Sequence, residues 1–163
     1  MKQAQPFRVL MVCTGNICRS PTAHGVLEKM VADAGLQHRV QVDSAGTHSY
    51  HVGEPPDARS LQHALRRGYD LSAQRARQLT RQDFDDFDLI LVMDSANEIA
   101  ARRIATAAQQ QRMKRLTDYC HRFEDREVPD PYYGGERGFE HVLDLVEDAC
   151  QNLLQTIAPN HQT

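Results

Sequence analysis

The sequence predicts a three-layer α/β fold, in which helices cover both faces of a parallel β-sheet. Two observations carry this prediction. First, short apolar segments alternate with longer amphipathic ones along the chain. Second, successive residues of the short segments are all apolar, as in strands whose sheet is buried on both faces. The clearest strand is "DLILVMD" at 88–94, and "FRVLMV" at 7–12 is another. Right-handed connections would place the carboxyl ends of all strands at one edge, where ligands bind in such folds.

The expected elements follow one another in order from the first strand. Ser20 is a favoured capping residue and Pro21 suits the first position of a helix that ends at Gly35. The later elements are a strand at 39–46, a helix from Asp57 to Gly68, the strand at 88–94, a helix over 95–111 with Ser95 and Glu98 as a capping box, a short strand at 112–116, and a helix from about 139 to 157.

Length and charge limit the possible functions. The chain has 163 residues, which suits one domain spanning 1–163, and its net charge of −3 offers no general basic surface for nucleic acid or an anionic membrane. The longest apolar run, "LILVM" at 89–93, is too short to cross a bilayer, and the first residues lack the apolar run of a signal peptide. The cysteine spacing does not predict a disulfide framework, so we expect a reducing, cytoplasmic location.

The loop "CTGNICRS" at 13–20 is the most informative stretch of the chain. It joins the end of a strand to the start of a helix, so several backbone N–H groups converge there and favour an anion. Gly15 and Asn16 are the residue types that enter left-handed backbone conformations most easily. The planar guanidinium of Arg19 suits two oxygens of a phosphate. The pattern therefore predicts a phosphate-binding loop.

Cys13 stands at the strand end of this loop, where the same positive field favours the thiolate form and makes it a nucleophile. The Ser20 hydroxyl could donate a hydrogen bond to that sulfur. Two other interpretations exist. Cys13 and Cys18 could form half of a metal site, but no matching second pair exists. A free cysteine is often only a small buried apolar residue, which suits Cys150 and Cys120 better than Cys13.

A second motif, "PDPYYGG" at 129–135, supplies a carboxylate between two prolines. Cleavage of a phosphate ester needs a proton for the departing oxygen, and Asp130 is the natural donor. Tyr132 and Tyr133 would form an apolar wall for a flat substrate ring. An ordinary turn that happens to contain an aspartate is the alternative.

Together, "VCTGNICRSP" at 12–21 and "DPYYGG" at 130–135 resemble the low-molecular-weight protein tyrosine phosphatases, and "DSAGT" and "ARQL" match that family in order. The resemblance covers essentially the whole chain. It implies a flavodoxin-like fold with a four-stranded parallel sheet and neither metal nor cofactor. It also implies four roles: Cys13 as nucleophile, Arg19 as phosphate clamp, Ser20 as thiolate partner and Asp130 as general acid.

The resemblance further implies that Asn16 holds a left-handed position through side-chain bonds to Ser44 and to a histidine. In this chain the place of that histidine, within "SAQRARQL", is taken by Gln74, whose amide can still donate a hydrogen bond. Tyr50 aligns with an aromatic residue of the substrate cleft. The residues expected to bind phosphate or support the loop are Thr14, Gly15, Asn16, Ile17, Cys18, Ser20 and Ser44.

The resemblance predicts hydrolysis of phosphotyrosine in proteins or peptides, with inorganic phosphate and similar oxyanions as inhibitors. We expect a monomer, with weak self-association as an alternative. Three other functions stay open. Phosphoarginine phosphatases resemble this family but tend to carry Thr where this chain has Ile17. Arsenate reductases of related design carry a further pair of resolving cysteines, which is missing here. A non-catalytic phosphate-binding module would lack the nucleophile or the acid, and this chain has both.

Overall fold

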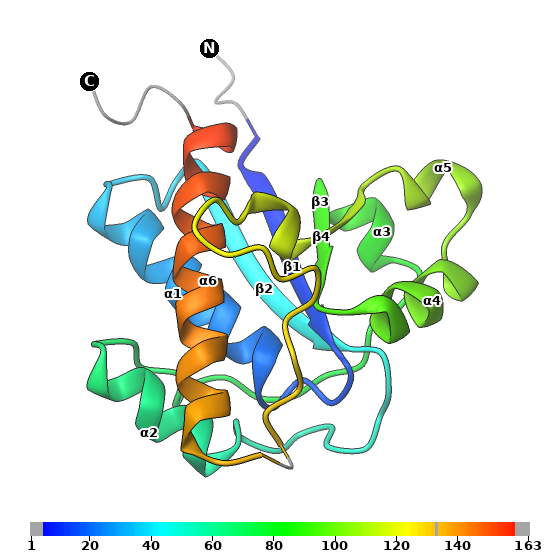
Figure 1. Cartoon of the computed structure of the whole chain (residues 1–163). Helices are drawn as coiled ribbons and strands as arrows, with labels where there is room; N and C mark the ends of the chain where they lie inside the picture. The colour runs from blue at the N-terminus through cyan, green and yellow to red at the C-terminus, as the bar shows by residue number, and fades with distance from the viewer. Residues whose placement is uncertain (1–4, 133, 159–163) are drawn as a thin grey trace.

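A computed structural model describes residues 5–132 and 134–158, and its centre is a four-stranded parallel sheet (Figure 1). The strands are β1 (Phe7–Cys13), β2 (Val40–Gly46), β3 (Leu89–Val92) and β4 (Met113–Arg115), in the spatial order β2-β1-β3-β4. Phe7 lies opposite Val40 and Val9 opposite Leu89, so β1 is a central strand paired on both sides. The predicted three-layer, flavodoxin-like class is confirmed.

Helices cover both faces of the sheet (Figure 1). On one face α1 (Arg19–Asp33) packs against α6 (Glu136–Ile157), with α2 (Ala58–Arg66) beside α6. The short helices α3 (Asp83–Asp86) and α5 (Ala107–Gln110) lie with α4 (Ser95–Ile104) on the other face, and a 3₁₀ turn, η1 (Leu116–Tyr119), follows β4. None of the described helices is long and apolar enough to cross a membrane.

The sheet has an apolar core on each face because successive side chains of a strand point to opposite sides. Val9 and Met11 of β1 pack into the core under α1 and α6, whereas Leu10 and Val12 pack into the core that includes Phe84. All four β1 residues are fully buried. This explains the continuous apolar run that predicted the strand, and it holds the carboxyl end of β1 rigidly at the edge of the sheet.

The helix starts differ from the sequence predictions in two places. The backbone of α1 is already helical at Arg19, and its Ser20 hydroxyl contacts Cys13 and Asn16 instead of capping the helix. At α4, the residue that caps the helix is Asp94, whose carboxylate accepts the Asn97 N–H, and not Ser95. In both places the side chain contacts the loop that follows β1 or its Arg19: Ser20 contacts Cys13 and Asn16, and Asp94 accepts from Arg19.

The single helix expected over 95–111 is two helices. Ala105 leaves the helical conformation, and Thr106 then caps α5 through a reciprocal pair of hydrogen bonds with Gln109. A Thr with a Gln three residues later offers the backbone its own helix start, which competes with continuation of α4. The other predicted elements are present, with ends shifted by up to three residues.

Candidate active site

The loop after β1 is folded so that its peptide carbonyls point outward. The carbonyl oxygens of Cys13 and Thr14 accept hydrogen bonds from the N–H groups of Thr47 and His48, and that of Ile17 accepts one from Asp57. In a planar trans peptide the N–H points opposite to the carbonyl. The N–H groups of the residues that follow these carbonyls therefore point into the loop, an arrangement that suits an anion.

The close packing of this loop against β2 depends on Gly46. A β-carbon at that position would lie 2.7 Å from the Thr14 carbonyl oxygen and 3.1 Å from the Asn16 backbone nitrogen. Any side chain there would push the loop away from the end of β2. Gly46 also lies opposite Cys13 in the register of the two strands.

Cys13 lies at the bottom of the loop, with only 3% of its surface exposed. Its Sγ is 3.0 Å from the Ser20 Oγ. A hydroxyl at this distance can donate a hydrogen bond to a thiolate and so stabilise the charged, nucleophilic form.

Asn16 holds the loop in shape. Its φ of 59° is in the left-handed region, which costs a residue other than glycine about 1–3 kcal/mol unless the surroundings hold it. The Asn16 Nδ2 donates to Ser20 Oγ at 2.8 Å and to Ser44 Oγ at 3.0 Å. The Asn16 Oδ1 accepts the backbone N–H of Arg77 at 3.0 Å. Three hydrogen bonds therefore fix a side chain whose backbone is strained.

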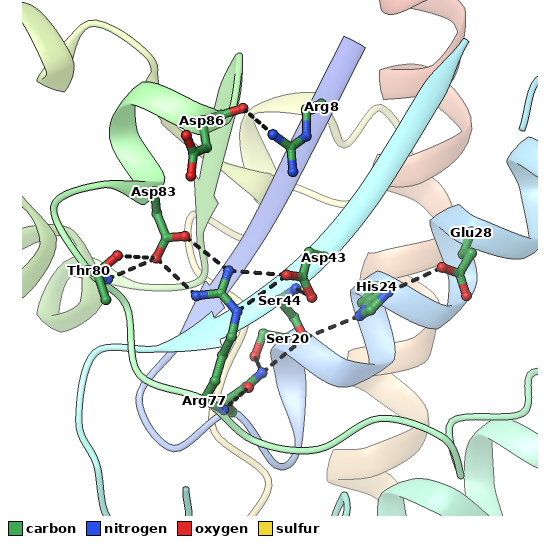
Figure 2. Close-up of polar contacts among 11 residues, drawn as sticks. Arg8, Ser20, His24, Glu28, Asp43, Ser44, Arg77, Thr80, Asp83 and Asp86 are labelled. Atoms are coloured by element: carbon green, nitrogen blue, oxygen red, sulfur yellow. Dashed lines mark hydrogen bonds and ion pairs between the residues drawn. The ribbon is translucent and has the colours of Figure 1, made fainter. Parts of the chain in front are cut away.

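The segment around Arg77 is itself anchored, as Figure 2 shows. The Arg77 guanidinium pairs with Asp43 of β2 at 3.1 Å and with Asp83 of α3 at 3.0 Å. Burial alone would lower the pKa of Arg77, but these two carboxylates raise it above its ordinary value. The ion pairs keep the Arg77 backbone in reach of Asn16.

Arg19 is almost completely buried, at 2% exposure, and is held by groups that follow β3 and β4 in the chain. Its Nη1 donates to the Asp94 carboxylate at 2.6 Å and to the Val128 carbonyl at 3.0 Å. Burial would lower the pKa of Arg19, but the Cys13 sulfur and Asp94 outweigh it and raise that pKa. Arg19 is therefore a fixed cation beside Cys13.

Asp130 stands over the loop, and its carboxylate lies 3.7 Å from the Arg19 Nη2. Its side chain is 46% exposed, so protons can exchange with solvent. The Tyr132 N–H donates to the Asp130 Oδ1 at 3.0 Å, which fixes the carboxylate within its turn. The two sequence motifs, more than a hundred residues apart, thus meet at one site.

These groups line a cleft of about 380 Å³, a size that suits a small aromatic ligand. Ile17 forms part of its wall and belongs to a small apolar cluster against which Tyr132 packs. Tyr50 also lines the cleft, is 72% exposed and stacks on His48 with ring centroids 5.0 Å apart. Tyr133, the third aromatic residue predicted from the sequence, lies outside the described residues.

A comparison with known families decides the classification. Residues 8–163 match the family described as low molecular weight phosphotyrosine protein phosphatase. The chain belongs to this family. The members of the family that resemble it span nearly its whole length, so the shared motifs lie in the same overall framework.

A Synechocystis protein provisionally named as a low molecular weight protein-tyrosine-phosphatase is 50% identical over 152 residues, 93% of this chain and 96% of its own. A crystal structure of a protein tyrosine phosphatase from Entamoeba histolytica has a TM-score of 0.91 at 39% identity, covering 94% of this chain and 97% of that chain. A Drosophila arginine phosphatase has a TM-score of 0.85 at 35% identity, covering 93% and 98%.

Four side chains of the site were missed in the sequence: Asp94, Asn97, His51 and His24. Asn97 donates to the Thr14 hydroxyl at 3.0 Å, so it supports the loop from α4 as Asp94 supports Arg19. The sequence did contain a signal for Asp94 and Asn97, because both follow β3 and so lie at the same edge of the sheet as Cys13. His51 lines the cleft and is hydrogen-bonded to Glu54, and no motif marked it.

The prediction for Gln74 was wrong in its contact. The Gln74 amide donates to the Pro21 carbonyl at 3.0 Å and not to the Asn16 network. The histidine that contacts this network is His24 of α1, which lies 3.2 Å from the Ser44 Oγ. Among residues 5–132 and 134–158, no group of three or more His, Cys, Asp or Glu side chains is placed to hold a metal ion.

Cys18, the other cysteine of the loop, is buried, and this burial above all raises its pKa to about 12. It is therefore a neutral thiol at physiological pH and a poor nucleophile toward phosphorus. It also lines the cleft that contains Cys13. Oxidation of Cys13 to a sulfenic acid would place an electrophilic sulfur in the same cleft, and condensation with the Cys18 thiol would release water and form a disulfide.

We expect mild peroxide to inactivate the protein and dithiothreitol to restore it, with a Cys13–Cys18 linked peptide visible by mass spectrometry. Cys18→Ser should recover poorly, because its sulfenic acid is open to further, irreversible oxidation. Cys120→Ser, which removes a thiol outside the cleft, is the matched control and should recover like the parent. Equal recovery of Cys18→Ser and the parent would show that Cys18 does not protect Cys13.

Proposed function

We propose that this protein hydrolyses phosphotyrosine monoesters in proteins or peptides through a phosphocysteine intermediate formed on Cys13. One observation carries the proposal. A cysteine at the bottom of an amide-lined loop has a fixed cation, Arg19, on one side and a carboxyl group, Asp130, at the mouth of the cleft. Family membership supports the same reaction class.

In the first step the Cys13 thiolate attacks the phosphorus in line with the leaving oxygen. The loop amides and Arg19 hold the equatorial oxygens, where charge is greatest in the transition state. The S–P bond forms as the P–O bond to the phenol breaks. Asp130 gives its proton to the departing phenolate oxygen, so tyrosine leaves as a neutral phenol.

In the second step water attacks the phosphocysteine from the position that the phenol has left. Asp130, now ionised, takes a proton from this water, and the S–P bond breaks. The hydroxyl of Ser20, 3.0 Å from the sulfur, donates to the thiolate that departs. Inorganic phosphate is released, and both Cys13 and Asp130 return to their starting forms.

The shape of the cleft supports a preference for aryl phosphates. Cys13 is 3% exposed, so a substrate must carry its phosphate on an extended side chain to reach it. The walls at Ile17, Tyr50 and Tyr132 offer apolar surface to a flat ring. A phosphoserine would bring its own backbone against these walls before its phosphate reached the loop.

We expect kcat/KM for a phosphotyrosine peptide to exceed that for the matching phosphoserine peptide by at least about 100-fold, because only the former fills the cleft and reaches the loop. Peptides of one sequence, differing only in the phosphorylated residue, provide the control. Comparable values for the two peptides would contradict the proposed substrate class.

Phosphoarginine is the second candidate substrate, favoured by the similarity to the Drosophila arginine phosphatase. Against it stands Ile17, which presents an aliphatic wall where the resemblance associates Thr with phosphoarginine enzymes. A phosphoarginine peptide in the same panel separates the two. A higher kcat/KM on phosphoarginine would replace the proposed substrate while leaving the roles of Cys13 and Arg19 intact.

We further infer that the protein works in a reducing compartment such as the cytoplasm, since Cys13, Cys18, Cys120 and Cys150 are free thiols. Inorganic phosphate, the product, would compete with substrate for the loop. We propose that the single domain acts as a monomer and needs no metal, because the nucleophile, the cation and the proton donor all come from its own side chains.

A further inference from the structure

The segment that carries Asp130 has no regular secondary structure, so its position depends on the contacts on either side of that residue. On the amino side the chain is fixed at Val128. The Val128 N–H donates to the Met93 carbonyl at 2.7 Å, and the Val128 carbonyl accepts from Arg19 at 3.0 Å. Val128 is fully buried, so the chain is anchored two residues before Asp130.

On the carboxyl side the chain is held by Arg59 of α2. The Arg59 Nη2 donates to the Tyr132 carbonyl at 2.9 Å. The Arg59 guanidinium also lies over two aromatic rings, 5.4 Å from the centroid of Tyr132 and 4.8 Å from that of Phe139. Tyr132 in turn donates its N–H to the Asp130 carboxylate. The residue that Arg59 holds is therefore the one that holds Asp130.

Arg59 is itself held by Asp57, the residue that caps α2. The Arg59 Nε donates to Asp57 Oδ1 at 3.2 Å, and its Nη2 donates to Asp57 Oδ2 at 3.1 Å. The Nη2 group has two hydrogens, so it can serve Asp57 and the Tyr132 carbonyl together. Burial would raise the pKa of Asp57, but the hydrogen bonds from Arg59 outweigh it and lower that pKa, which keeps the carboxylate charged.

Asp57 also contacts the loop that carries the nucleophile. Its backbone N–H donates to the Ile17 carbonyl at 2.8 Å. One residue at the start of α2 therefore joins the loop after β1 to the side chain that holds the Asp130 segment. Through this connection the proton donor and Cys13 share one frame, although they lie in different parts of the sequence.

We propose that Arg59 is a positioning residue for proton transfer: it fixes Tyr132 against α2 and thereby keeps the Asp130 carboxyl group in place above Cys13. The proposal rests on the phosphatase function proposed above. Among the described residues that line the cleft, Arg59 is not one, so it acts through Tyr132 and not on the substrate.

Proton transfer needs this support because the Asp130 side chain has weak contacts of its own with the rest of the site. The side chain is 46% exposed, and its 3.7 Å distance from the Arg19 Nη2 is longer than a hydrogen bond. A general acid must come within about 2.6–3.2 Å of the oxygen that it protonates. A displacement of about 1 Å can lower a rate about 100-fold. Phosphate binding uses the loop amides and Arg19, and does not depend on the position of Asp130.

Arg59→Met tests the proposal, because methionine keeps an apolar side chain of similar length but cannot donate to the Tyr132 carbonyl. We expect kcat/KM for phenyl phosphate, whose phenol needs a proton to leave, to fall about 10-fold. On 2,4-dinitrophenyl phosphate, whose phenolate leaves unaided, the loss should stay within about twofold. The affinity for inorganic phosphate should also stay within about twofold. General damage to the loop after β1 would instead lower all three.

Two further variants separate the hydrogen bond from the charge. Arg66→Met removes the same charge from an exposed position of the same helix, and it should behave like the parent on both substrates. Arg59→Lys keeps the charge and a donor but loses the planar fork that serves two acceptors. Its loss on phenyl phosphate should be smaller than that of Arg59→Met. Thermal unfolding checks that each variant is folded.

A double-mutant cycle with Asp130→Ala asks whether Arg59 acts through the proton donor. In the Asp130→Ala background no carboxyl group remains to be positioned. Arg59→Met should therefore lower kcat/KM for phenyl phosphate no further in that background. Additive losses would show that Arg59 acts on the reaction by another route.

Hydrogen exchange in the absence of substrate separates this inference from the proposed function. In Arg59→Met, the amides of the segment 129–132 should exchange faster than in the parent, and those of 13–19 at the parental rate. A parent without activity on any aryl phosphate would contradict the proposed function, and the exchange would still decide whether Arg59 holds the segment. The inference is overturned if exchange in 129–132 does not change, if Arg59→Met loses the same factor on both substrates or nothing on phenyl phosphate, or if the cycle is additive.

Discussion

Replacing Cys13 by serine should lower kcat for aryl phosphates by more than about 100-fold while leaving oxyanion binding nearly unchanged. The reason is that binding and reaction belong to different groups of the same loop. The inward amides and the buried Arg19 hold the phosphate, and they remain in the variant. The sulfur alone supplies the nucleophile. Turnover of p-nitrophenyl phosphate and calorimetric binding of inorganic phosphate measure the two effects separately.

The matched control is Cys120→Ser, because burial and the neighbouring Asp148 raise the pKa of this cysteine to about 12 and it lies outside the cleft. It should keep the parental kcat. If Cys13→Ser retained more than about 1% of the parental activity, the nucleophile would have to be another residue.

Replacing Asp130 by alanine should lower kcat roughly 10²- to 10⁴-fold on phosphotyrosine, whose phenol is a poor leaving group without a proton. The loss should shrink on activated phenyl phosphates, whose phenolates leave unaided. In the parent, activity should fall as the pH rises because Asp130 must hold its proton for the first step. This basic limb should be absent from the variant on phosphotyrosine.

Asp130→Asn provides the matched comparison, since its amide can keep the bond to the Tyr132 N–H but cannot give up a proton. It should be impaired like Asp130→Ala on phosphotyrosine. If the alanine variant showed the same dependence on leaving group as the parent, the proton donor would have to be sought elsewhere, and Asp130 would serve only to orient Arg19.

The sequence predicted those parts of the site whose reactive residues are marked by their close neighbours in the chain. Cys13, Arg19 and Ser20 lie within eight residues, and a strand before and a helix after them define the loop that they share. Asp130 was found because two prolines surround it. In both cases the neighbouring residues were enough to single out these side chains.

The missed residues act across long sequence separations. The bond from Arg19 to Asp94 spans 75 residues and that from Asn97 to Thr14 spans 83. Nothing in the sequence next to Asp94 or Asn97 indicates a partner at such a distance along the chain. Asp94 could have been found only by asking which polar side chains follow β3, because parallel strands end at one edge of the sheet.

His24 shows a different limit. It lies four residues after Ser20, so the helical period places both on one face of α1. The sequence nevertheless directed attention to Gln74, because the resemblance placed the histidine in that segment. The geometry of this chain instead places the imidazole beside Ser44 from the helix side. The expected histidine contact to this network is therefore present, but the histidine comes from α1 and not from the segment that contains Gln74.

The central claim is that phosphate passes through Cys13, and trapping the intermediate tests it most directly. The protein is mixed with an activated aryl phosphate, quenched in acid within milliseconds and digested for mass spectrometry. Asp130→Ala is included, since loss of the base in the second step should let the intermediate accumulate on this substrate. We predict phosphate on Cys13 at a level close to one per active site. Turnover with no phosphorylated Cys13, or with phosphate on another residue, would contradict the account.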